Sequence, residues 1–182
     1  MQRTQAPGNL AWLDIEMTGL NPETDVILQV ALIVTDVNLA VREEYVCDVW
    51  QPSSALTAMV PFVRQMHERT GLLDRVARST TDLWAAEKQL LERIAAWCPY
   101  PAVLCGNSIA QDRRFLDRQM RGLAGYLHYR MIDVTTLKLL AGYWYGAEAI
   151  FAKPDAGEHD ALVDIRNSIA ELAHYRRHLL RP

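Results

Sequence analysis

The chain has 182 residues, of which 50% are hydrophobic and 23% charged, and its formal net charge is −3. At roughly 100–200 residues per domain, this length favours a single domain, expected over residues 1–182 with a flexible N-terminus at 1–8. The composition excludes a disordered or low-complexity protein, and the lack of a basic excess argues against non-specific binding of long nucleic acid, which needs many cations on phosphates.

The cysteines and the N-terminal residues bear on the cellular compartment. Cys47, Cys98 and Cys105 are odd in number and lack CxxC spacing, which favours reduced thiols over a disulfide framework. The N-terminal residues lack the apolar core of a signal peptide, and no apolar run approaches the roughly 18 residues of a membrane span. We therefore expect a cytoplasmic protein that does not enter a membrane.

Three strands are expected first, over residues 10–17, 26–35 and 41–50. The first alternates, so that Asp14 and Glu16 share one face. The second is an apolar run rich in β-branched residues, which is typical of a central strand. Short turns between the three predict an antiparallel meander.

Helical periodicity then alternates with shorter strands. A helix is expected at residues 58–67, with Gly71 after it as the residue that stops it. A second helix is expected at 81–97. Next come a strand at 102–105, a helix at 109–120, a strand at 131–134 and a helix to about residue 145. An irregular stretch follows at 146–157. The last expected helix, at about 160–179, places along one stripe Ile165, Ile169, Leu172 and Arg176. This order predicts an α/β fold with a mixed five-stranded sheet flanked by helices.

Asp14 and Glu16 are the first candidate site residues. Two carboxylates on one face of an apolar strand are costly unless they are protonated or bind a cation. An exposed edge strand with ordinary surface acids would show the same pattern.

Further candidates lie at the starts of two later helices. Asp112 falls in the first turn of a helix that follows a strand, a position where α/β folds place functional side chains. The helix dipole alone also favours an acidic residue there. Five residues apart, His159 and Asp164 would point about 140° apart on a regular helix. They can face one centre only if His159 lies at or before the helix start, which Gly157 permits. The alternative is that His159 is a loop histidine with no functional role.

Taken together, four carboxylates from three segments and one histidine match a two-metal phosphodiester site. Hard oxygen ligands suit Mg²⁺ or Mn²⁺, and two such ions stabilise the attacking and leaving oxygens of an in-line displacement. A histidine, which titrates near neutrality, can take the proton of the attacking water.

The same residues sit in longer strings: WLDIEMTGL at 12–20, CGNSIAQDRRFL at 105–116, HYR at 128–130 ahead of IDVTTLK at 132–138, and HDALVD at 159–164. These strings resemble the motifs of the DEDD superfamily of 3′-to-5′ exonucleases, in its histidine subtype, and within it the oligoribonuclease family. The resemblance covers about residues 9–180. It implies a ribonuclease-H-like fold and hydrolysis of very short RNA, down to dinucleotides, to 5′-mononucleotides. It also implies a homodimer with no obligate protein partner.

The resemblance also implies a role for individual residues. Two divalent ions, Mg²⁺ or Mn²⁺, would be held by Asp14, Glu16, Asp112 and Asp164, and the general base would be His159. Contacts to substrate would come from Leu20, which wedges against the terminal bases, from Phe62 and His67, and from Ser108 near the 5′ end of a dinucleotide. The partner's site would be reached by Tyr129, Arg130 and Thr135. The chain departs from the family pattern at Phe62, where relatives usually carry Trp, and at Ala110, where they often carry Gly.

Two other functions remain open. A proofreading or tRNA-trimming exonuclease of the same superfamily would share the carboxylates but would need a longer strand track or a polymerase partner. The acidic charge balance and the HYR string favour the short-substrate enzyme instead. A catalytically silent nucleotide-binding module would often lack at least one ligand, whereas this chain has the complete set.

Overall fold

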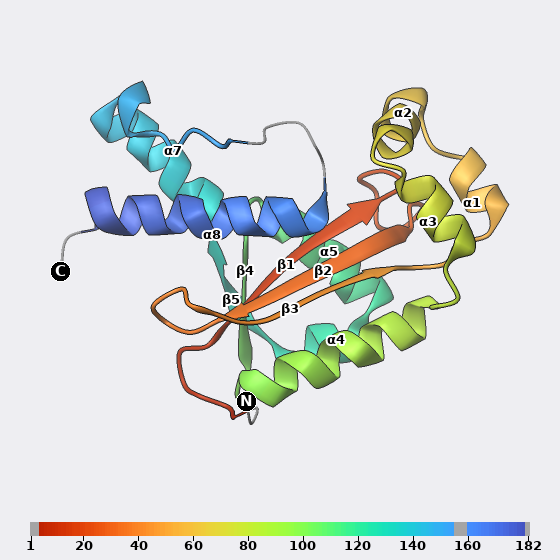
Figure 1. Ribbon diagram of the computed structural model, residues 1–182, viewed down its shortest axis with the longest axis horizontal. Helices are drawn as coiled ribbons and strands as arrows, with labels where there is room; N and C mark the ends of the chain where they lie inside the picture. Colours follow the sequence, from red (N-terminus) through yellow and green to blue (C-terminus); the bar gives the residue numbers. More distant parts are fainter. Residues whose placement is uncertain (1–3, 155–159, 181–182) are drawn as a thin grey trace.

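The computed structural model describes residues 4–154 and 160–180, and it arranges them as one sheet between layers of helices (Figure 1). In chain order the strands are β1 (Leu10–Met17), β2 (Ile27–Thr35), β3 (Val41–Asp48), β4 (Ala102–Gly106) and β5 (Leu127–Asp133). They lie side by side in the order β3-β2-β1-β4-β5. The first three pair antiparallel, and β1–β4 and β4–β5 pair parallel. The expected mixed five-stranded sheet with a three-strand meander is confirmed.

The helices and the 3-10 helix η1 are α1 (Ser53–Thr57), α2 (Pro61–Arg69), α3 (Leu72–Arg78), α4 (Leu83–Trp97), α5 (Ala110–Gln119), α6 (Arg121–Tyr126), α7 (Val134–Tyr145), η1 (Ala147–Ala149) and α8 (Ala161–His178). Helices α4 and α8 cover opposite faces of the sheet, and α2 lies beyond the C-terminal end of β1 (Figure 1). All nine residues of β2 are buried, because helices cover both of its faces.

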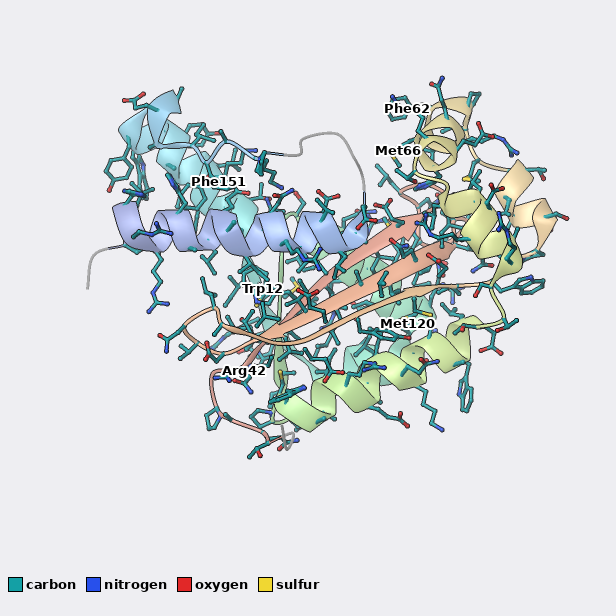
Figure 2. All side chains as sticks on the ribbon, viewed as in Figure 1. Trp12, Arg42, Phe62, Met66, Met120 and Phe151 are labelled. Atoms are coloured by element: carbon teal, nitrogen blue, oxygen red, sulfur yellow. The ribbon has the colours of Figure 1, made fainter. Side chains whose placement is uncertain are left out.

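Strand β1 sends alternate side chains into two different cores. Leu13 and Ile15 belong to the cluster that also contains Leu90 and Ile94 of α4. Trp12 belongs to the cluster under α8, as Figure 2 shows. Because side chains alternate along a strand, Asp14 and Glu16 share the α8 side with Trp12. This alternation places both carboxylates where the N-terminus of α8 approaches the sheet.

Several element boundaries differ from the expected ones. The helix expected at 58–67 corresponds to α2, which begins three residues later, because Pro61 opens it at a position where a missing backbone N–H costs nothing. Gly71 does mark a helix boundary: its φ of 67° is left-handed, and α3 begins at the next residue. Helices α1, α3 and α6 were not expected, and β3 ends at Asp48 rather than at residue 50.

Two smaller features concern the N-terminal residues and the cysteines. Within the segment expected to be flexible, the Ala6 amide donates to the Trp97 carbonyl oxygen at 3.2 Å, at the end of α4. Cys47, Cys98 and Cys105 are all free thiols. Within residues 4–154 and 160–180, no helix combines the length and apolar character needed to cross a membrane.

Candidate active site

Carboxylates from β1 and α8 meet at one point. Each of Asp14, Glu16 and Asp164 offers an oxygen, and these oxygens all lie within 4.8 Å of one another. The packing beside them explains the convergence: Trp12, two residues before Asp14 on the same face, shares a buried cluster with Ile165, the residue after Asp164. The hydrophobic contact between β1 and α8 therefore brings like charges together.

Asp112 joins this group from α5. It is buried in the first turn of α5, and its Oδ1 accepts a hydrogen bond from the Ile15 backbone amide at 3.0 Å. Ile15 lies between Asp14 and Glu16 in the strand, so this bond holds the Asp112 carboxylate beside both. The structure thus brings together all four carboxylates that the sequence singled out as ligands.

The electrostatics of the group favour a bound cation. Burial, followed by repulsion from Asp164 and Asp112, raises the pKa of Glu16 to about 8. Burial also raises the pKa of Asp112 to about 7, and burial together with the negative charge of Asp112 raises that of Asp14. Each ionised carboxylate is costly here without a compensating positive charge. The donors are all hard oxygens, which is the ligand set that Mg²⁺ and Mn²⁺ prefer, so these residues fit divalent ions.

His67 supports the end of β1. Its side chain is completely buried on α2, with Nε2 2.9 Å from the Met17 carbonyl oxygen and Nδ1 3.8 Å from Glu16 Oε2. The resemblance predicted a contact with substrate at this position. This contact stays a prediction; in the structure the ring has no exposed surface and lies against the end of β1, next to the Glu16 carboxylate.

Leu20 and Phe62 are large apolar side chains left in solvent, 71% and 72% exposed. Leu20 follows β1, and its carbonyl oxygen accepts a hydrogen bond from Gln111 Nε2 at 2.7 Å, one residue before Asp112. Phe62 lies in the first turn of α2, the helix that carries His67 (Figure 2). Their exposure leaves both free to contact a base.

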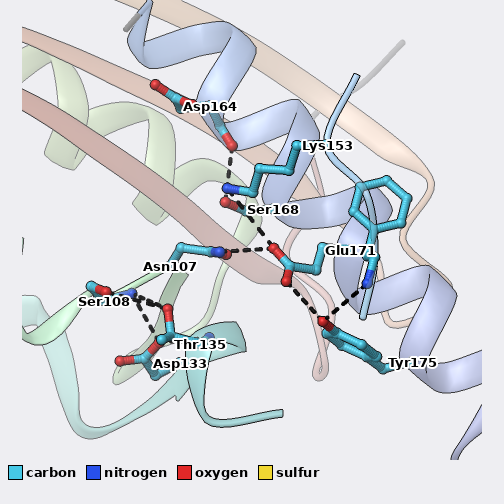
Figure 3. Close-up of polar contacts among 10 residues, drawn as sticks. Asn107, Ser108, Asp133, Thr135, Lys153, Asp164, Ser168, Glu171 and Tyr175 are labelled. Atoms are coloured by element: carbon cyan, nitrogen blue, oxygen red, sulfur yellow. Dashed lines mark hydrogen bonds and ion pairs between the residues drawn. The ribbon is translucent and has the colours of Figure 1, made fainter. Parts of the chain in front are cut away.

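Ser108 and Thr135 lie next to each other (Figure 3). The Ser108 amide donates to Asp133 Oδ1 and to Thr135 Oγ1, each at 2.9 Å, and Ser108 has a left-handed φ of 51°. The resemblance predicted that Thr135 reaches the partner's site. This stays a prediction. Within the chain, the Thr135 hydroxyl lies against Ser108, because the Asp133 side chain both caps α7 and accepts the Ser108 amide hydrogen bond.

Tyr129 and Arg130 lie away from the carboxylates, on the edge strand β5. The Tyr129 side chain is 74% exposed, and its ring stacks on His128 with 4.5 Å between centroids. The Arg130 guanidinium carbon lies 5.2 Å from the centroid of the Tyr129 ring. His159, the predicted general base, lies outside the described residues.

A buried polar group beside the site was missed in the sequence. Glu171 of α8 is completely buried and contacts Asn107, Lys153 and Tyr175 (Figure 3). The predicted apolar stripe on this helix was wrong at Arg176, which is exposed. A spacing of Asp164, Ser168, Glu171 and Tyr175 along one helical face was the available signal, since residues four and seven apart share a face.

Comparison with known proteins agrees with this geometry. The family model described as Exonuclease (RNase_T) matches residues 11–172. The chain is 47% identical over 177 residues to an oligoribonuclease of Nitrosomonas eutropha, covering 96% of this chain and 97% of the relative. It is 46% identical over 179 residues to an oligoribonuclease of Ectopseudomonas mendocina, covering 97% and 99%.

Solved structures add the fold. An exonuclease I from Methylocaldum szegediense superposes with a TM-score of 0.76 at 18% identity, over 95% of this chain and 41% of that one. E. coli exonuclease I in complex with an oligonucleotide gives 0.76 at 16% identity, over 98% and 42%. The chain spans about two fifths of these structures, and the likeness confirms the ribonuclease-H-like fold. The chain belongs to the oligoribonuclease family of exonucleases.

Proposed function

We propose that this protein hydrolyses very short RNA, down to dinucleotides, and releases 5′-mononucleotides. As a member of the oligoribonuclease family it is a 3′-to-5′ exoribonuclease. The observation that carries the proposal is the convergence of Asp14, Glu16 and Asp164 within 4.8 Å, with Asp112 hydrogen bonded to the strand between the first two. The net charge of −3 provides no general excess of cations along which a long strand could bind.

The four carboxylates would hold two divalent cations, Mg²⁺ or Mn²⁺. Support comes from their all-oxygen donor set and from the raised pKa values of Asp14, Glu16 and Asp112, which reflect uncompensated negative charge. When bound, such ions stabilise the negative charge that develops on the attacking and leaving oxygens. Asp112 would also have a structural role, because its hydrogen bond to the Ile15 amide holds it beside Asp14 and Glu16.

The protein's own groups would orient the substrate and move one proton. Leu20 would wedge against the terminal bases, Phe62 and His67 would contact the substrate, and Ser108 would lie near its 5′ end. His159 would take a proton from the attacking water as its oxygen bonds to phosphorus. The bond from phosphorus to the 3′ oxygen of the preceding nucleotide breaks, and this oxygen leaves with the shortened strand.

A homodimer would complete the binding of a dinucleotide. A dinucleotide offers a single internal phosphodiester and a 5′ end, so few contacts along the strand are available. Tyr129 and Arg130 of one subunit would close over the 5′ end in the other subunit. The support for this contact is the position of both residues on an edge strand, where the exposed Tyr129 ring stacks on His128 and lies 5.2 Å from the Arg130 guanidinium carbon.

The proposal is tested by Asp14→Asn, with Asp74→Asn as a matched control at an exposed acid of α3. A neutral amide is a poor ligand for a hard divalent ion, so Asp14→Asn should nearly abolish cleavage of a labelled diribonucleotide at saturating Mn²⁺. Its melting temperature without divalent ions should equal or exceed that of the wild type, because one repelling charge is gone. Retention of more than a tenth of wild-type turnover would contradict the ligand assignment.

A further inference from the structure

Lys153 is one of only three lysines in the chain, with Lys88 and Lys138. It lies in the irregular segment after η1, and its side chain is 22% exposed. No motif of the family resemblance includes it. Its surroundings nevertheless set it apart from an ordinary surface lysine.

The partner of Lys153 is the buried carboxylate of Glu171. Both oxygens of this carboxylate already accept hydrogen bonds: Oε2 from Asn107 Nδ2 at 2.8 Å and Oε1 from the Tyr175 hydroxyl at 2.9 Å (Figure 3). The Lys153 ammonium lies 3.8 Å from Oε2, beyond hydrogen-bond distance. Glu171 therefore holds Lys153 by charge while the three N–H donors of the ammonium are left for another acceptor.

The ammonium also lies near the carboxylate cluster, because its partner Glu171 follows Asp164 by about two turns on the same face of α8 (Figure 3). Its positive charge lowers the pKa of Asp14, against the burial and the three carboxylates that raise it. The Lys153–Glu171 pair therefore lies beside the site, close enough for the charge of the ammonium to act on a site carboxylate. Asn107, which fixes the Glu171 end, directly precedes Ser108, so the pair is also tied to the β4 end of the site.

Charge balance shows what such a cation can bind. With two divalent ions bound, the four ionised carboxylates would be compensated, so the scissile phosphodiester would add one further negative charge to the site. An ammonium with free donors, held at a fixed place beside the cluster, is suited to a phosphate oxygen, and a charge-assisted hydrogen bond of this kind is worth more than a neutral one.

We propose that Lys153, positioned by the buried carboxylate of Glu171, binds a non-bridging oxygen of the scissile phosphodiester. This inference rests on the proposed function of the same site. Lys153 is the substrate-contacting residue of the pair, and Glu171 acts only by positioning it. The ligand class is a phosphodiester monoanion, recognised by its charge rather than by its bases.

The test compares two dinucleotide analogues by titration calorimetry in Mg²⁺. One carries a methylene group in place of the 3′ bridging oxygen, which keeps the phosphonate charge and cannot be cleaved at that bond. The other carries an uncharged methylphosphonate linkage. Each is titrated into the wild type, Lys153→Met, Lys153→Gln and Lys153→Arg, and into Lys88→Met as a control on the far side of the sheet, in α4.

Lys153→Met and Lys153→Gln should bind the charged analogue about tenfold more weakly, and the neutral analogue within twofold of the wild type. Lys153→Arg should retain most of the affinity, and Lys88→Met all of it. The ratio of the two affinities does not depend on the fraction of folded protein, so a loss of stability does not mimic the result. Equal losses for both analogues, or no loss for either, would overturn the proposal.

Failure of the proposed function would look different. In that case Asp14→Asn would still cleave the diribonucleotide, or the wild type would bind neither analogue. An inactive Asp14→Asn enzyme together with an unchanged affinity ratio in Lys153→Met would overturn the lysine contact alone.

Discussion

Asp112 Oδ1 accepts a hydrogen bond from the backbone amide of Ile15 at 3.0 Å, which joins the first turn of α5 to β1 midway between Asp14 and Glu16. The same carboxylate raises the pKa of Asp14 and of Glu16 by its negative charge. The Asp112 side chain therefore fixes the position of β1 at the site and also adds to the repulsion among the carboxylates. The two effects can be separated by substitution.

Asp112→Asn should keep the bond to Ile15 through its amide oxygen and should remain close to wild-type stability, yet lose nearly all turnover. Asp112→Ala leaves a buried amide without its acceptor, which costs about 1–3 kcal/mol of unfolding free energy. Urea denaturation without divalent ions, together with diribonucleotide turnover in Mn²⁺, measures both. Equal stability of the two variants would show that the bond to Ile15 contributes nothing.

Glu16 should make the metal-free protein less stable as pH rises. A carboxyl group with a folded pKa of about 8 holds its proton in the folded state but loses it in the unfolded state above about pH 4.5. The folded state then binds more protons, so stability falls from about pH 4.5 to pH 8. Glu16→Gln removes this dependence and should gain on the wild type by up to a few kcal/mol over that window.

The measurement is the difference in unfolding free energy between Glu16→Gln and the wild type, taken at pH 5 and pH 8 in a chelating buffer. Addition of Mn²⁺ should reverse the order at pH 8, because ionised Glu16 then has a cation to compensate it. A difference that stays constant with pH would contradict the raised pKa of Glu16.

His159 is expected to act as the general base. Only its neutral form can take a proton, so the wild-type rate should climb through a pKa near or above about 6.5 and then level off. His159→Ala should lose most turnover, lose the histidine step of the pH profile, and still bind dinucleotide in the presence of metal. His178→Ala, at the C-terminal end of α8, is the control. A normal rate and an unchanged profile in His159→Ala would remove the histidine from the mechanism.

Tyr129 should matter more for a dinucleotide than for longer RNA. If it closes over the 5′ end in the other subunit, Tyr129→Ala should lower kcat/KM for a dinucleotide at least about tenfold, or roughly 1.4 kcal/mol. A seven-residue RNA should lose less, since its extra nucleotides do not fit under that contact. Tyr100→Ala, at another exposed tyrosine, controls for loss of surface area. A monomeric wild type in sedimentation with full activity, or equal losses on both lengths, would refute the contact.

The sheet and the shared face of Asp14 and Glu16 could be predicted because their signals are local. Alternation along β1 places Asp14 and Glu16 on one face, and an uninterrupted apolar run marks β2 as central. Helices α1, α3 and α6 were missed because five, seven and six residues cover fewer than two helical turns, which is too short for a periodic pattern to stand out.

The remaining features depend on tertiary contacts. His67 is buried only because α2 folds over the end of β1, and no spacing along the chain predicts that. Lys153 and Glu171 come from an irregular segment and a helix, so their pairing follows from packing rather than from a motif. The contact between Ser108 and Thr135 likewise depends on how β4 and β5 end side by side.

The central claim, that the carboxylate site cleaves very short RNA, is tested most directly by substrate length. A labelled diribonucleotide, a 20-mer RNA and DNA of matched lengths are compared by kcat/KM, each with Mg²⁺ or Mn²⁺ and with chelator. We predict that the diribonucleotide is the best substrate, that the 20-mer is cleaved at least about tenfold less efficiently, and that chelator abolishes all turnover. Equal or better cleavage of the 20-mer, or full activity in chelator, would contradict the account.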